Sequence, residues 1–218
     1  MNLDNLQLMI TAIPFLLQAT LKTIYLSIGS MAGALIVGLI IAIFRITGIR
    51  LLAGFGRFYV SFFRGTPLLI QLYLWYYGLT HLGIVMNPWT AAFMGLSFHV
   101  GAYISESFRA AIQSIDKGQW EASLSLGMTN RQTFQRIILP QAWRRSIPPV
   151  FNSLVNAVKD TSLASILTIG ELAYQSDILI ASSGFVALPI ILETLLIYWG
   201  LTTLLNIAQN TLEKRLQY

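Results

Sequence analysis

The sequence predicts an all-α integral membrane protein with five transmembrane helices and a cytoplasmic helix-turn-helix in one connection. Hydrophobic residues make up 55% of the 218 residues and charged residues only 11%, which exceeds the apolar content of a soluble domain of this size. Long apolar segments alternate with short polar ones, and Lys and Arg are concentrated in alternate connections. We therefore expect a single transmembrane domain over residues 1–218, with an external N-terminus and a cytoplasmic C-terminus.

The charge and residue content exclude several classes of function. The net charge is +5, but the arginines flank apolar segments instead of forming a patch with interleaved aromatic residues, so no nucleic-acid partner is predicted. The chain has no cysteine, and His81 and His99 are isolated, so no metal site is expected. It also lacks a G-x-x-x-x-G-K-[ST] phosphate loop and an H-E-x-x-H motif, which argues against an enzyme. No cofactor is predicted for this chain, and any energy source must lie on another polypeptide.

The first predicted span is residues 23–44, which carry no charge and are long enough, at ~1.5 Å per residue, to cross a hydrocarbon core of ~30 Å. Its recurring small residues favour the close approach of another helix. Before it, residues 1–22 have no basic region and no cleavage site, so we expect an uncleaved start in which Pro14 interrupts a helix. After it, four arginines and no acid indicate a cytoplasmic linker. These arginines are Arg45, Arg50, Arg57 and Arg64.

The second span, residues 55–82, contains the string Arg64-Gly65-Thr66-Pro67, so we expect a kink or re-entry there. Arg64 either extends to the lipid phosphates or has a direct gating role. Residues 81–88 lack Lys and Arg, so we expect them to form a loop on the external side of the membrane.

The third span, residues 89–108, places His99, Tyr103 and Glu106 on one stripe. Two interpretations are open for this stripe. Glu106 pairs with Arg109 while His99 is a core residue with satisfied hydrogen bonds, or the stripe contacts substrate.

The connection at 109–145 is rich in Lys and Arg and is therefore expected in the cytoplasm. Asp116 suits the N-cap of a first helix, and Gly127 suits the left-handed residue that ends it. Thr129 and Gln132 then form a capping box for a second helix, which we expect to end near Pro140. The sequence thus predicts two short helices joined by a sharp turn.

The fourth span is expected to begin at the Pro148-Pro149 pair and to continue to about Ile169. Asn152, Asn156 and Asp160 lie on one face of it, and a charge near the membrane midplane costs at least ~2.5 kcal/mol. Asp160 is therefore predicted to face a polar pathway, with Thr161 and Ser162 supplying hydroxyls. The alternative is that Lys159 and Asp160 pair with other helices and fix the register of the bundle. Residues 170–185 are expected to form an external loop, and residues 185–208 the fifth span.

The stretch at residues 121–140 contains a set of residues at fixed spacing: Glu121, Ala122, Gly127, Ile137, Leu139 and Pro140. This set resembles the cytoplasmic loop of bacterial ABC-importer permeases, whose pattern is Glu-Ala-Ala, three residues, Gly, nine residues, Ile, one residue and Leu-Pro. Ser123 replaces the second alanine that the family usually has. The strings R-G-T-P-L-L-I-Q-L and K-D-T-S-L are similar to those of the polar amino-acid branch of this family, and the resemblance covers nearly the whole chain.

The resemblance implies a type I importer permease in a bacterial inner membrane that takes up a polar amino acid. Its partners would be two ATPase subunits, which bind ATP and Mg²⁺, a second permease subunit, identical or not, and an external solute-binding protein. The seven loop residues, Ser123 included, would dock to the ATPase. Asp160 would hold the substrate ammonium, with Thr161, Ser162, Asn156, Glu106, His99 and Arg64 as further pathway candidates. A rival hypothesis is an ion-coupled transporter or channel that works alone, with Glu106, His99 and Asp160 as a proton relay.

Overall fold

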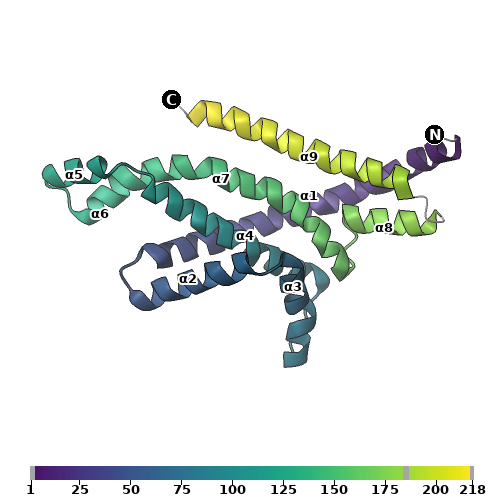
Figure 1. Ribbon diagram of the computed structural model, residues 1–218, viewed down its shortest axis with the longest axis horizontal. Coiled ribbons are helices and arrows are strands. Elements are labelled where there is room, and N and C mark those ends of the chain that lie inside the picture. Colours follow the sequence, from purple (N-terminus) through teal and green to yellow (C-terminus); the bar gives the residue numbers. More distant parts are fainter. Residues whose placement is uncertain (1–2, 184–186, 217–218) are drawn as a thin grey trace.

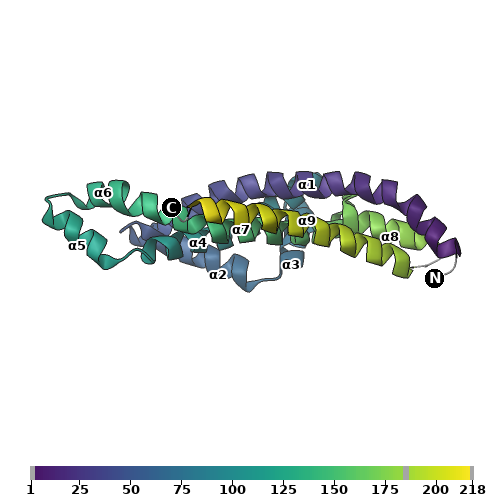
Figure 2. The same ribbon diagram turned by 90° about the horizontal axis from the view of Figure 1, so that it is seen from above.

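The computed structural model describes residues 3–183 and 187–216, which form an elongated bundle of helices (Figures 1 and 2). The α-helices are α1 (Leu3–Ile46), α2 (Arg50–Gly65), α3 (Leu68–Tyr73), α4 (Pro88–Gln113), α5 (Lys117–Ser125), α6 (Asn130–Thr133), α7 (Leu139–Asp160), α8 (Leu172–Ser182) and α9 (Ala187–Leu216). Two π-helical turns, η1 (Leu74–Gly78) and η3 (Phe134–Ile138), and two 3₁₀ segments, η2 (Leu79–Leu82) and η4 (Thr161–Leu167), connect them. The all-helical class predicted from the sequence is confirmed.

The core of the bundle is the long contact between α1 and α4. The small residues of α1 face α4, as their spacing predicted. A Cβ atom added at Gly38 would lie 2.6 Å from Cγ2 of Ile104, so no larger residue fits there without displacing α4. Ala34, Ala42 and Val100 are buried in the same contact. Close backbone approach of this kind compensates for the absence of a hydrophobic driving force between helices in lipid.

Two described helices are long and apolar enough to cross a membrane, within Met9–Ile46 and Ala187–Arg215. A third candidate is the pair Asn130–Leu167 and Leu172–Ser182, which is bent by 51°. The predicted second and third spans do not meet these criteria, because the second is split and polar side chains lower the hydropathy of the third. The number of spans therefore stays a prediction, and the expected start of the fifth span at residue 185 lies outside the described residues.

The expected break in the second span is confirmed. α2 ends at Gly65, Thr66 is extended with φ −121° and ψ 148°, and α3 begins after Pro67. The cause is local, because a residue that precedes proline is driven away from the helical region. Figure 1 shows α3 and the turns after it running away from the direction of α2.

The other proline-based predictions were wrong. Pro14 lies inside α1, which continues unbroken through it. The helix expected to end near Pro140 instead passes through the π-helical turn η3 directly into α7, with Pro140 in its first turn. A π-helical turn changes the hydrogen-bond register just before a residue that cannot donate, so the chain remains helical. Pro148 and Pro149 do not start a helix, since both lie inside α7.

The fourth predicted span also ends differently from the prediction. α7 stops at Asp160, the chain continues as η4, and Thr168 turns it with a left-handed φ of 59°. Residues 172–182, expected as an external loop, form the helix α8. The expected loop was wrong because the segment has an N-cap that the charge pattern does not reveal. Glu171 accepts hydrogen bonds from the backbone N–H groups of Ala173 and Tyr174 at 3.0 and 2.8 Å.

Glu171 is fully buried, and it also accepts a hydrogen bond from the Tyr198 hydroxyl of α9 at 3.0 Å. Glu171→Gln is expected to destabilise the chain by about 1 kcal/mol, because one charged acceptor serves three donors. For a chain of this size that corresponds to a fall of about 2–4 °C in the melting temperature, measured on the purified protein. Asp177→Asn, an exposed change on the same helix, is the matched control, and equal melting of the two variants would contradict the prediction.

Candidate functional site

A polar cleft of about 400 Å³ lies between α4 and α7. α4 contributes His99, Val100 and Tyr103, and α7 contributes Ser153, Asn156, Lys159 and Asp160. The α7 residues recur at spacings of three and four, so one face of that helix supplies all of them. This cleft joins residues from two helices that the sequence analysis treated separately.

Asp160 and Lys159 bring opposite charges to the cleft without forming an ion pair with each other. The ion pairs among the described residues involve Glu106 only, so neither Asp160 nor Lys159 has such a partner there. Adjacent residues on a helix project about 100° apart, which keeps these two charges from meeting. The cleft therefore offers both a carboxylate and an ammonium group to a dipolar ligand.

The predicted pathway residues fall into two groups. Asp160, Asn156 and His99 meet in the cleft, whereas Thr161, Ser162 and Glu106 are not among its lining residues. The Thr161 hydroxyl is buried and donates to the backbone oxygen of Val158, and Ser162 donates to that of Lys159, each at 2.7 Å. Their hydroxyls stabilise the end of α7, because the last carbonyl groups of a helix lack intrahelical donors.

Arg64 lies at the edge of the cleft. Its guanidinium carbon is 5.1 Å from the centre of the Tyr103 ring, which is within the range of a cation–π contact. Arg64 thus contacts a cleft-lining residue from the end of α2, directly before the helix break.

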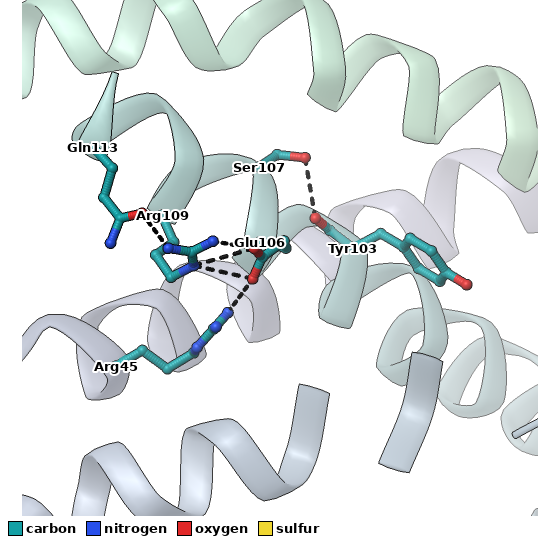
Figure 3. Close-up of polar contacts among 6 residues, drawn as sticks. All are labelled: Arg45, Tyr103, Glu106, Ser107, Arg109 and Gln113. Carbon is teal, nitrogen blue, oxygen red and sulfur yellow. Dashed lines mark hydrogen bonds and ion pairs between the residues drawn. The ribbon is translucent and has the colours of Figure 1, made fainter. Parts of the chain in front are cut away.

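Glu106 is held by two arginines, as Figure 3 shows. Arg109, one turn along α4, and Arg45, from the end of α1, both donate to its carboxylate. The predicted Glu106–Arg109 pair is therefore present, with Arg45 as a second partner that sequence spacing could not identify. The Tyr103 ring points away from this group in the same view. The arrangement ties the C-terminal end of α1 to α4.

Gln71 of α3 is a site residue that the sequence analysis missed. Its side-chain oxygen lies 3.0 Å from Nδ1 of His99, and the residue is only 2% exposed. A polar residue buried in an apolar helix, four residues after a proline break, is the sequence signal that could have identified it.

The hairpin, defined as residues 116–140, follows the predicted capping pattern. Asp116 accepts a hydrogen bond from the backbone N–H of Gly118 at 2.6 Å, and Gly127 has the left-handed φ of 80°. Thr129 and Gln132 form the capping box. Figures 1 and 2 show α5 and α6 projecting at one end of the molecule, opposite α8 and the start of α1.

The hairpin has an inner and an outer surface. The Ser123 hydroxyl is buried, donates to the backbone oxygen of Trp120 at 2.9 Å and lies 3.0 Å from the Thr133 hydroxyl. Ser123, which stands where the family usually has alanine, thus links α5 to α6 through its hydroxyl. Ile137 packs beside Trp120 on the inner side, whereas Leu124 and Leu126 on the outer side are 43% and 83% exposed. Glu121, Ala122, Gly127, Leu139 and Pro140 are also exposed.

Comparison with known proteins identifies the family. Residues 34–218 match the family model described as "Binding-protein-dependent transport system inner membrane component". The chain is 42% identical over 217 residues to the probable amino-acid permease protein YxeN of Bacillus subtilis, covering 98% of this chain and 96% of the relative. It is 41% identical to the L-cystine transport system permease protein TcyB of the same organism, covering 93% of this chain and 87% of the relative.

Solved structures agree with this assignment. A crystal structure described as an amino acid ABC transporter with histidines matches with a TM-score of 0.92 and 30% identity, over 99% of this chain and 100% of the other. The MetNI methionine ABC transporter, in an inward-facing conformation, shares the fold with a TM-score of 0.67 at 18% identity, over 99% of each chain. The chain belongs to the family of binding-protein-dependent transport system inner membrane components, the permease subunits of ABC importers.

Proposed function

We propose that this chain is a permease subunit that imports a polar amino acid across a bacterial inner membrane. The substrate class follows its relatives, whose names specify cystine, glutamine and arginine. The observation that carries the proposal is the cleft that contains both Asp160 and Lys159, because an amino acid carries an ammonium and a carboxylate on one carbon. Asp160 receives the ammonium, with Asn156 and His99 as further contacts, and Arg64 borders the path.

The second part of the proposal is the route by which ATP hydrolysis reaches the cleft. Two ATPase subunits, which bind ATP and Mg²⁺, dock on the exposed hairpin residues, with Glu121 meeting a basic group and Leu124 and Leu126 entering an apolar cleft. α7 begins at the hairpin and ends at Asp160, 22 residues or about 33 Å away. Movement of the ATPase subunits would therefore act on the substrate site through one helix.

The topology completes the proposed assembly. Five spans place the N-terminus outside and residues 109–145 in the cytoplasm, in agreement with the distribution of Lys and Arg. A second permease subunit forms the other wall of the pathway, and an external solute-binding protein delivers the amino acid. Glu106 does not serve as a proton relay in this scheme, since both of its oxygens accept from arginines.

The test is reconstitution of the chain in proteoliposomes with its ATPase subunit and solute-binding protein. Uptake of radiolabelled cystine, glutamine or arginine is expected only when both partners and ATP are present. Omitting the ATPase is the control that separates this proposal from the ion-coupled transporter. Uptake by the chain alone, driven by a proton or sodium gradient, would contradict the proposal.

A further inference from the structure

Gln71 occupies a position that connects the helix break to the cleft. Its side-chain nitrogen donates to the backbone oxygens of Phe63 and Thr66 at 3.0 and 3.1 Å and to the Thr66 hydroxyl oxygen at 2.8 Å. These acceptors belong to the end of α2, where carbonyl groups lack helical partners because Pro67 follows. On the other side, the side-chain oxygen of Gln71 faces Nδ1 of His99.

The acceptors at the break determine which way the Gln71 amide points. Backbone oxygens can only accept, so the NH₂ group of Gln71 must face Phe63 and Thr66. The Thr66 hydroxyl donates to the backbone oxygen of Phe62 at 2.8 Å and therefore also accepts from Gln71. The oxygen of Gln71 is thus left for His99, and an amide oxygen can only accept. His99 consequently carries a proton on Nδ1.

The second nitrogen of His99 belongs to a ring that lines the cleft. The hydrogen bond to Gln71 uses Nδ1, and the backbone of Phe63 is a further hydrogen-bond partner of the ring. His99 lines the cleft, and its ring lies 5.3 Å from that of Tyr103, centre to centre. Neutral imidazole with a proton on Nδ1 presents a lone pair at Nε2, which is an acceptor on the same cleft as the Asp160 carboxylate.

We propose that Gln71 is a positioning residue that holds His99 with its proton on Nδ1, so that Nε2 accepts a hydrogen bond from the substrate ammonium. The role in substrate binding rests on the proposed function. Because Gln71 also caps the end of α2, the helix break and the cleft wall are joined through one side chain. The cation–π contact between Arg64 and Tyr103 is a second connection between the helix break and the cleft wall.

Nuclear magnetic resonance of a single histidine tests the positioning directly. The chain has two histidines, so His81→Asn leaves His99 as the only histidine of this chain. His81 lies in η2, 18 residues before His99, and is not a cleft residue. In the assembled complex labelled with ¹⁵N-histidine, we expect a protonated Nδ1 and an unprotonated Nε2. Gln71→Leu is expected to move the proton to Nε2, because it removes the acceptor that Nδ1–H meets. A protonated Nε2 in the otherwise unchanged protein would overturn the proposal.

Transport kinetics test the consequence for the substrate. Gln71→Leu is expected to raise KM for uptake by about 2- to 10-fold, the value of one hydrogen bond, with kcat little changed. In a His99→Ala background the same substitution should have no further effect on KM, because Gln71 acts through His99. Additive effects of the two substitutions would overturn the proposal.

Together, the resonance and transport experiments distinguish failure of this proposal from failure of the proposed function. If Gln71→Leu fails to assemble, Gln71→Met, which is similar in length and lacks the amide oxygen, serves in both experiments, and an Nδ1 proton retained in it would overturn the positioning role. If uptake is unaffected by every cleft substitution while the proton is found on Nδ1, the positioning is correct and the assignment of the cleft to substrate fails.

Discussion

Asp160→Asn is expected to raise KM for amino-acid uptake by about 10- to 100-fold, the value of one hydrogen bond between charged groups, about 1.5–3 kcal/mol. Asparagine keeps the size and the oxygen acceptor of the side chain and removes the negative charge. Asp160 forms no ion pair within 4 Å among the described residues, although the charge of the adjacent Lys159 acts on it at longer range. We therefore expect the rise in KM to come mainly from the lost contact with the substrate ammonium. The measurement is uptake in proteoliposomes together with stimulation of ATP hydrolysis by the loaded solute-binding protein.

The matched control for this change is Asp177→Asn, which removes one carboxylate from the exposed surface of α8 and is not a cleft residue. Melting of both complexes shows whether they are assembled. Wild-type KM in a stable Asp160→Asn complex would reject the role of the cleft. A lowered melting temperature with unchanged KM would instead support the alternative in which Asp160 fixes the register of the bundle.

Gly127→Asp is expected to reduce uptake about tenfold or more while ATP hydrolysis continues. Gly127 has a φ of 80°, in the left-handed region that costs an L-residue roughly 1–2 kcal/mol. A Cβ atom there meets no other atom within 4 Å, so the cost arises from the backbone and not from a clash. A distorted turn carrying a new charge would prevent the hairpin from following the ATPase. The measurement is the ratio of substrate imported to ATP hydrolysed.

Two further variants divide this effect into its causes. Gly83 also has a φ of 80° with nothing within 4 Å, but it follows η2, a segment separate from the hairpin. Gly83→Asp thus brings the same strain and charge to another place, and we expect it to keep the import ratio. Asn and Asp enter the left-handed region at similar cost, so Gly127→Asn introduces the same backbone change without the charge, and the difference between the two variants is the electrostatic part. Coupled transport by Gly127→Asp, or equal uncoupling by Gly83→Asp, would contradict the docking role.

The features that the sequence predicted correctly are local ones. The caps at Asp116 and Thr129, the left-handed Gly127 and the break before Pro67 each depend on residues within four positions of one another. The close approach of α1 and α4 was also predictable, because small residues at helical spacing have few other uses in a membrane.

The predictions that failed required knowledge of the surrounding structure. The expectation that proline ends a helix applies to an isolated helix. It did not predict the π-helical turn η3 that precedes Pro140, or that α7 continues through Pro148 and Pro149. The partnership of His99 with Gln71 crosses 28 residues, and that of Arg45 with Glu106 crosses 61. No periodicity within one helix reveals such pairs. The sequence therefore suggested Asp160, Asn156 and His99 as pathway residues, and the structure shows that they line one cleft, but it could not indicate their neighbours on other helices.

The proline pair within α7 has a mechanical consequence. Neither Pro148 nor Pro149 can donate to the carbonyl group four positions earlier, so the oxygens of Arg144 and Arg145 lose their usual α-helical donors. α7 therefore lacks two of its own backbone hydrogen bonds near its middle, where its resistance to bending is lowest. If the ATPase contact lies at the hairpin, as proposed above, a displacement there would reach Asp160 as a rotation about this point, and the two halves of α7 would tilt by different amounts.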